Sequence, residues 1–249
     1  MKTERLDGIT YTLDDGKYYV TGHDADVESA IIRLTLNGIP VVGIAEEAFS
    51  HCTTLVTVEF VDHPDEIDDD FRNFEIGDYA FMGCSGLTSI ELPDFTGSVG
   101  RGAFHSCTSL VTAVLPYMLC YIAPYAFYQC TSLRMLSPLW NVAEGVCSHC
   151  ASLKALPIGC VSEIDEDAFE HCDSLTEITI PKSVKRIEAL AFRGCKGLTK
   201  VTFESPNGWY SRNRYTDLEY NIDLSDPVKN ALSLSRMDFD DGVTAWYKK

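Results

Sequence analysis

Two cysteines three positions apart, Cys147 and Cys150, are the first residues whose types and spacing suggest chemistry. They lie in the segment GVCSHCASL, residues 145–153, and His149 stands between them. A Cys-x-x-Cys pair can contribute to a zinc site or cycle between a dithiol and a disulfide. Its meaning depends on how the chain uses the same residues elsewhere.

The second of these cysteines belongs to a sequence repeat. Six windows share the pattern Ala-Phe-x-x-Cys-x-x-Leu, and they begin at positions 48, 80, 103, 126, 168 and 191. A seventh window, residues 146–153, has Val-Cys in place of Ala-Phe, so Cys147 occupies the phenylalanine position and Cys150 is the repeat cysteine. The repeat cysteines, at positions 52, 84, 107, 130, 150, 172 and 195, are 32, 23, 23, 20, 22 and 23 residues apart. We therefore interpret the Cys-x-x-Cys as one substitution at a core position and expect no metal or redox role, because structural zinc requires four ligands.

Each repeat also predicts a β-strand after its leucine. Apolar residues alternate with polar ones, as Ile178 and Ile180 do around Thr179, which is typical of a half-buried strand. A second apolar pair, such as Val184 and Ile187, precedes the next Ala-Phe-x-x-Cys segment. There we expect a single helical turn, because side chains three positions apart share one face of a helix. One such coil cannot bury its apolar side alone, but stacked coils can.

Stacking would place the seven repeat cysteines in a buried column. Thiols are common small core fillers. Successive coils lie about 4.8 Å apart, which exceeds the roughly 3.8 Å between the Cβ atoms of a disulfide. We therefore predict free thiols, which suit a reducing setting. Cys120 and Cys160 lie off this column, and the sequence leaves their state open.

Other groups in the chain give weak signals for chemistry. The acidic segment DHPDEIDDDFRN, residues 62–73, extends the first complete coil by nine residues. It could hold calcium, but Asp70 stands where an EF-hand loop counted from Asp65 needs glycine, and a solvated loop is the simpler interpretation. His149 and His171 occupy equivalent positions in neighbouring coils, where exposed polar residues are the ordinary finding. Without a nucleophile elbow, a phosphate loop or a His-Glu-x-x-His motif, we predict no catalytic residue, no metal, no cofactor and no enzyme activity.

Composition and charge narrow the choice of partners. The chain has 249 residues, of which 45% are apolar, so a substantial core is expected. Its net charge of −17 argues against binding to nucleic acid or to anionic membranes and would attract a basic partner. No apolar run reaches roughly 20 residues, so we expect no membrane insertion. The N-terminus has no hydrophobic segment, which fits a cytoplasmic or phage-borne protein if Met1 is native, and a cell-surface or secreted one if a leader has been removed.

The repeats resemble the BspA-type leucine-rich repeat family, whose coil reads roughly Ile-Pro-x-x-Val-x-x-Ile-Gly-x-x-Ala-Phe-x-x-Cys-x-x-Leu. Residues 180–198, IPKSVKRIEALAFRGCKGL, follow this pattern closely, with Glu188 at the usual glycine. The likeness covers about residues 38–210. It implies an α/β solenoid, a right-handed leucine-rich-repeat superhelix of about seven coils of roughly 23 residues with a curved sheet. It also implies protein or surface binding, often as an adhesin, and no catalytic residues.

A solenoid needs caps at both ends. We expect N-terminal capping β-hairpins at 1–37, the repeat solenoid at 38–210 and a small C-terminal cap at 211–249, all in one continuous domain. The Asp-Gly turn within ITYTLDDGKYYVTG and the Asn37-Gly38 pair within IIRLTLNGIPVVGI each predict a hairpin. Asp226 before Pro227 predicts the start of a short helix, which a strand at residues 244–249 follows.

The outward-facing residues of the strands provide the candidate binding surface. In the outer coils they are polar or acidic, whereas Val114 and Met135 make the middle coils apolar. Aromatic residues, Tyr117 and Trp140 among them, lie on nearby bends. We predict a protein-binding patch formed by Glu91, Val114, Tyr117, Met135, Trp140 and Glu177. The alternative for Trp140 is an inward orientation that fills the volume left by Cys147.

The function that fits these features is a non-enzymatic protein-binding scaffold that uses the exposed face of its curved sheet. The alternative is a cell- or phage-surface adhesin that binds a host protein or a glycan. Exposed strand edges and open ends would allow a monomer to self-associate weakly.

Overall fold

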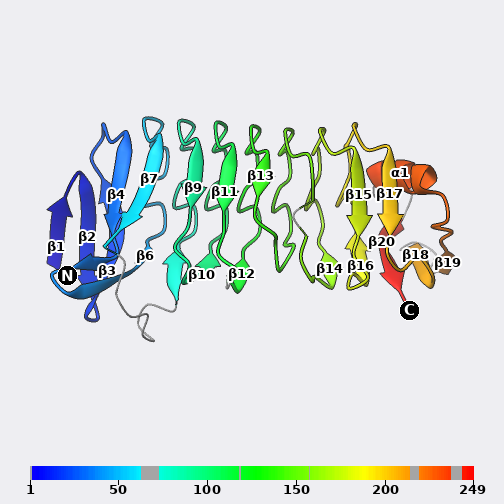
Figure 1. The fold of residues 1–249 in the computed structure, drawn as a ribbon, viewed down its shortest axis with the longest axis horizontal. Helices are drawn as coiled ribbons and strands as arrows, with labels where there is room; N and C mark the ends of the chain where they lie inside the picture. The colour runs from blue at the N-terminus through cyan, green and yellow to red at the C-terminus, as the bar shows by residue number, and fades with distance from the viewer. Residues whose placement is uncertain (1, 63–72, 118, 157, 214–218, 237–242) are drawn as a thin grey trace. The chain divides into compact units, whose positions relative to one another are not determined.

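The computed structural model describes residues 2–62, 73–117, 119–156, 158–213, 219–236 and 243–249. The chain forms two compact units, Met1–Ser137 and Pro138–Lys249. Each unit is a stack of coils made of short strands and turns (Figure 1), so the predicted solenoid is confirmed. The boundaries expected between the caps and the solenoid stay a prediction.

The first unit has its strands in two rows. One row is an eight-stranded sheet with the order β1-β2-β3-β6-β8-β10-β12, in which β5 pairs with β6. These strands are β1 Lys2–Leu6, β2 Ile9–Asp14, β3 Lys17–His23, β5 Thr35–Leu36, β6 Ile39–Ile44, β8 Phe74–Ile76, β10 Thr96–Val99 and β12 Tyr121–Ile122. The other row contains the pair β4 Ser29–Arg33 and β7 Thr57–Val61 and the sheet of β9 Ser89–Glu91, β11 Thr112–Val114 and β13 Met135–Leu136 (Figure 1).

Both expected hairpin turns are present at the N-terminal end. The strands β2 and β3 pair antiparallel across Asp15 and Gly16, and β5 and β6 across Asn37 and Gly38. These four turn residues have φ of 45°, 78°, 53° and 75°, as a type I′ turn requires. The second hairpin is shorter than expected, because β4 pairs in parallel with β7 rather than with β6. In that pairing, the alternate apolar side chains of β4 are buried in the first coil.

The Ala-Phe-x-x-Cys segments form turns, and the helical turn expected there was wrong. The residues before Ala and before Cys have left-handed backbones, as in Glu47 and His51 with φ of 57° and 59°, which a right-handed helix excludes. Their N–H groups donate to the next coil, from Glu47 to the Asp78 carbonyl at 3.0 Å and from His51 to the Met82 carbonyl at 2.6 Å. The left-handed residues therefore direct backbone amides along the stack and add a third hydrogen-bonded ladder to the two rows of strands.

Phenylalanine rings form a stacked column inside each unit. In the first unit the ring centroids of neighbouring coils are 5.0–5.3 Å apart, along Phe49, Phe81, Phe104 and Phe127. In the second unit Phe169 and Phe192 stack at 5.6 Å. All six rings are fully buried, so the repeat phenylalanine is the main filler of the core.

The repeat cysteines are buried and free, as predicted. Their thiols also make a hydrogen bond that the sequence pattern did not indicate. The Sγ atoms of Cys84 and Cys107 donate at 3.1 Å to the carbonyls of Phe49 and Phe81 in the preceding coil, and Cys130 repeats this contact. The cysteine position therefore requires a small apolar side chain that also carries a hydrogen-bond donor.

The second unit is closed by a sheet and a helix. The sheet order is β14-β16-β20-β18-β19, and β15 pairs with β17 separately. The elements are β14 Glu163–Ile164, β15 Glu177–Ile180, β16 Arg186–Glu188, β17 Lys200–Phe203, β18 Trp209–Asn213, β19 Glu219–Asn221, α1 Pro227–Arg236 and β20 Val243–Lys248. The last strand runs antiparallel to β16, so it ends the parallel stacking.

The helix α1 begins where the sequence predicted. The Asp226 carboxylate accepts hydrogen bonds from the backbone N–H groups of Val228 and Lys229, at 3.0 and 3.2 Å, which is an N-cap. At its other end, the Ser235 carbonyl accepts from the N–H of Gly194 at 3.1 Å. The helix thus supplies the acceptor that a further coil would have provided. Among the described residues, no helix combines the length and the apolar character that crossing a bilayer requires.

Candidate binding face

Three parallel strands of the first unit present one set of outward-facing side chains. We call this set the central face, and it consists of Ser89, Glu91, Thr112, Val114 and Met135. In register, Val114 lies beside Glu91, and Thr112 lies beside Met135. Val114 is 40% exposed and Met135 is 65% exposed, so two neighbouring strands offer apolar side chains to water. The structure therefore brings together three of the six predicted residues, Glu91, Val114 and Met135.

Tyr117 lies apart from the central face. It belongs to the connection between β11 and β12 and is 77% exposed. Tyr121, at the start of β12, is also exposed, while the intervening Met118 is outside the described residues. Tyr117 therefore lies on the bend of the coil and Tyr121 in the eight-stranded sheet, so neither belongs to the central face.

A pocket of about 290 Å³ opens beside the central face, between β7 and β9. Its lining residues are Val58, Glu59, Phe60, Glu91, Leu92, Pro93 and Asp94. The two strands belong to different sheets, because β7 pairs with β4 and β9 pairs with β11. Pro93 has no N–H to donate, so the ladder of β9 cannot continue past it. The pocket is thus a gap in the sheet with apolar walls and carboxylates at its rim.

The carboxylates of this pocket have no cationic partner in the part of the chain that the structure describes. Among the described residues, Glu59, Glu91 and Asp94 have no ion pair or side-chain hydrogen bond. The nearby cation Arg33 is already engaged, with its guanidinium 2.6 Å from Asp62 and 3.3 Å from Asp7. Among the residues that the structure describes, the negative charge of the pocket is therefore uncompensated.

The second unit places its two predicted residues in different settings. Glu177 faces outward from β15, where its carboxylate is 3.1 Å from the Nζ of Lys200 on the directly opposite position of β17. This acid is consequently neutralised. Trp140 is half-buried and lies over Gly159, where an added Cβ would be 3.0 Å from the indole Cε3.

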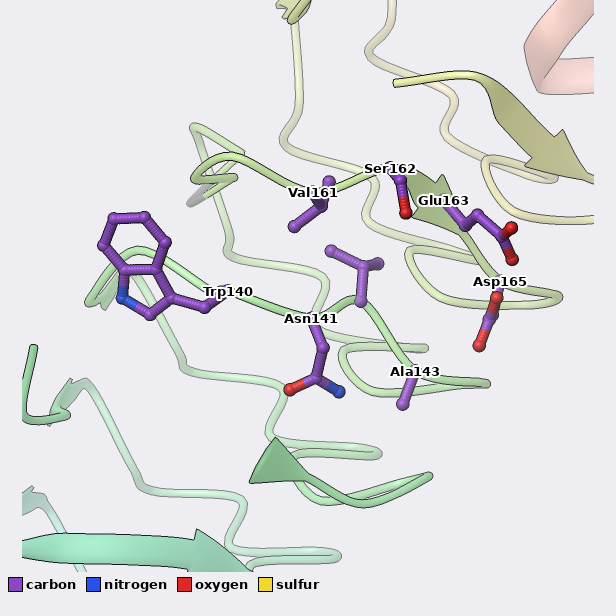
Figure 2. A pocket seen from close by; sticks show the side chains of 8 residues that line it. Trp140, Asn141, Ala143, Val161, Ser162, Glu163 and Asp165 are labelled. Atoms are coloured by element: carbon purple, nitrogen blue, oxygen red, sulfur yellow. The ribbon is translucent and has the colours of Figure 1, made fainter. Parts of the chain in front are cut away.

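Trp140 also lines a pocket of about 180 Å³. Figure 2 shows the indole at one side of this pocket, pointing away from the carboxylates of Glu163 and Asp165. The ring packing over Gly159 leaves part of the indole in contact with solvent, so its role in binding stays a prediction.

Several carboxylates of the second unit influence one another. Burial raises the pKa of Asp165, Glu166 and Glu188 above their usual values. The pKa of Asp167 is raised to about 6, first by burial and then by the negative charge of Glu170, Glu166 and Glu144. Protonation of this cluster is therefore easier than for ordinary surface acids.

Comparison with known proteins assigns the repeat to a family. Residues 44–172 and 162–216 match the BspA type Leucine rich repeat region, in six copies. The chain belongs to this family. No curated protein shows significant similarity to the chain.

Two solved structures of leucine-rich repeat proteins resemble the fold of this chain. A leucine rich cell surface protein from Faecalibacterium prausnitzii A2-165 is 24% identical with a TM-score of 0.67, and the match covers 91% of this chain and 60% of that one. The T. pallidum Leucine Rich Repeat protein is 26% identical with a TM-score of 0.52, and the match covers 82% of this chain and 84% of that one. The chain thus spans about three fifths of the F. prausnitzii protein.

Several buried cysteines of these BspA-type repeats are poorly suited to nucleophilic chemistry. Burial raises the pKa of Cys84 and Cys195 to about 12, and it also raises that of Cys107. For Cys147, the hydrogen bond with Cys150 raises the pKa first and burial second. A thiol that stays protonated at neutral pH is a weak nucleophile and a weak metal ligand.

The hypotheses of metal binding gain no support from the repeat. The rings of His149 and His171 are 4.8 Å apart, centroid to centroid. Within the described part of the chain, no three histidine, cysteine or acidic side chains are grouped so as to hold a metal ion. The calcium hypothesis concerns residues 62–73, of which 63–72 lie outside the described residues.

The sequence did not reveal the pocket between β7 and β9. Alternation along residues 57–61 is consistent with an outward-facing Glu59, but Phe60 and Asp94 carry no separate signal in the sequence. One signal in the sequence could have indicated the pocket. The first two repeat cysteines are 32 residues apart instead of 23, so this coil contains an insertion and cannot pair with the neighbouring coil over its whole length. The unpaired edge of the sheet lies beside this longer coil.

Proposed function

We propose that the chain is a non-enzymatic scaffold that binds a protein partner on the central face. The observation that carries this proposal is the exposure of Met135 and Val114 on adjacent strands, at positions where the neighbouring strands have polar residues such as Ser89 and Glu91. Exposed apolar side chains surrounded by polar ones are typical of protein-docking surfaces. The buried thiols with raised pKa support a role without covalent catalysis.

The proposal is tested by substituting Met135 with aspartate and measuring partner recovery from a lysate with the immobilised protein. A buried anion without a partner is costly at an interface, so Met135→Asp should reduce recovery at least tenfold. Thr202→Asp, an exposed position on β17 of the second unit, is the matched control and should leave recovery unchanged. Equal recovery by Met135→Asp and the wild type would remove the central face from consideration. Trp140→Ala, assayed in parallel, tests whether the predicted patch includes the indole.

A second candidate is an adhesin that binds a glycan at a cell surface. The observation that favours it is the pair of exposed rings, Tyr117 and Tyr121, because tyrosine faces stack on sugar rings. The F. prausnitzii protein is described as a cell surface protein, which fits such a role. Binding to a glycan array that is lost in Tyr117→Ala and kept in Met135→Asp would support this candidate over the first.

A further inference from the structure

The pocket between β7 and β9 has the chemistry of a receptor for a basic side chain. Its walls include Phe60, Leu92 and Pro93, which can cover the aliphatic stem of a lysine or an arginine. Glu59, Glu91 and Asp94 supply the negative charge at the rim, and none of them has a cationic partner among the described residues. A charged head group from outside the chain would therefore meet acceptors that no cation in the described residues occupies.

The central face continues from this pocket without interruption. Glu91 belongs to both, and Val114 lies directly beside Glu91 on the next strand. Met135 stands one strand farther, beside Thr112. Neighbouring strands lie about 4.8 Å apart, so Val114 is about 7 Å from the middle of the gap. Met135 is one strand farther and is displaced by two residues along its strand, which places it about 14 Å from the same point.

These spacings fit an extended peptide that crosses the strands. Side chains two residues apart in an extended chain point to the same side and are about 7 Å apart, and those four apart are about 13 Å apart. We propose that the partner of the central face presents an extended segment with a lysine or arginine in the β7–β9 pocket and apolar side chains two and four residues away, over Val114 and Met135. This inference rests on the proposed function and adds the chemical class of the ligand.

The charges at the two ends of the central face set the direction of such a segment. Arg134 is exposed next to Met135, so it would repel a basic residue at that end. The acids lie at the opposite end, at the pocket. The basic residue therefore binds at β7–β9 and the apolar residues at β11 and β13.

The test uses two capped synthetic peptides and the full chain. In one peptide, an arginine is followed by leucines two and four residues later, with threonine between them. In the other, citrulline replaces the arginine, which keeps the shape and removes the charge. We expect the arginine peptide to bind at least fivefold more tightly at low salt, and this preference should shrink at high salt because the pocket is open to solvent.

Protein variants assign the preference to the pocket. The double variant Glu59→Gln and Glu91→Gln should bring the ratio of the two affinities close to one without weakening the citrulline peptide. Glu177→Gln, whose acid is paired with Lys200 in the second unit, is the matched control and should keep the ratio. Equal affinity of the two peptides for the wild type, or an unchanged ratio in the double variant, would overturn the inference.

The same experiment separates this inference from the proposed function. Met135→Asp should weaken both peptides, because it alters the apolar part of the surface that they share. If Met135→Asp weakens both while the wild type does not distinguish arginine from citrulline, the central face binds partners but the basic residue is not required. If the arginine peptide does not bind the wild type at millimolar concentration, the proposed ligand class is wrong. In that case the recovery of the partner by Met135→Asp still tests whether the central face binds a protein.

Discussion

At the scale of single residues, the chain separates its cysteines by environment. The repeat cysteines are buried, and burial raises the pKa of several of them, to about 12 for Cys84. They should resist alkylation at pH 8, because reagent reaches buried thiols slowly and the reactive species is the thiolate. Cys120 and Cys160 are exposed and should react. Brief treatment of the native protein with iodoacetamide, followed by peptide mass spectrometry, should therefore label these two positions. Labelling in denaturant, the control, should reach all ten cysteines. Rapid modification of Cys84 in the native protein would contradict the burial of the repeat cysteines.

The repeat cysteines also show which features of single residues can be predicted from the sequence and which cannot. Burial and free thiols followed from the spacing of the repeat, because a coil separation of about 4.8 Å does not suit a disulfide. The hydrogen bond from Cys107 to the Phe81 carbonyl did not follow, since it depends on the turn that positions both groups. That turn contains left-handed residues such as Ser106, with φ of 59°, which are not glycine and so give no signal in the sequence.

At the scale of elements, α1 is held by one buried polar side chain. Asn230 donates from Nδ2 to the carbonyls of Val201 and Leu224, both at 3.1 Å. Asn230→Leu should lower the free energy of unfolding of the second unit by about 2–3 kcal/mol, because two buried carbonyls lose their donor. Leu232→Ser, on the exposed side of the same helix, should change it by less than about 0.5 kcal/mol. Urea unfolding followed by circular dichroism measures both, and a near-neutral Asn230→Leu would show that the helix is not docked through this residue.

The elements that the sequence predicted are those whose signal is local. The Asn37-Gly38 turn and the cap at Asp226 each depend on a few adjacent residues, and both are present. The pairing of β4 with β7 was missed because it joins segments 28 residues apart in register and competes with the nearer hairpin. The candidate face was partly predictable for the same reason. Alternation identified Glu91, Val114 and Met135 as outward-facing, but the gap beside them arises from strand pairing.

At the scale of the whole molecule, charge should link stability to pH. The chain carries a net charge of −17, so added protons reduce its internal repulsion. The acidic cluster of the second unit adds a specific effect, since burial and neighbouring carboxylates raise the pKa of Asp167 from 3.8 to about 6. A raised pKa means that the folded state binds the proton more tightly than the unfolded state. This contribution is complete below about pH 4 and is lost as the pH rises through about 6.

Asp167 should therefore stabilise the folded second unit more at pH 5 than at pH 7.5. Burial lowers the pKa of His23 and His105, so these two groups act in the opposite sense over the same range. The Asp167 contribution is therefore measured as the change that its substitution makes. After allowance for solvent screening of a half-buried group, we expect Asp167 to contribute about 1 kcal/mol, or about 2–4 °C in Tm. Thermal unfolding at the two pH values measures this difference, and Asp167→Asn should reduce it by raising the stability at pH 7.5. Asp94→Asn, which removes one charge from the first unit outside this cluster, is the matched control for net charge and should reduce the difference less. A pH dependence of Tm that Asp167→Asn leaves unchanged would contradict the assignment, because the protonated carboxyl of Asp167 would then not be the form that the fold prefers.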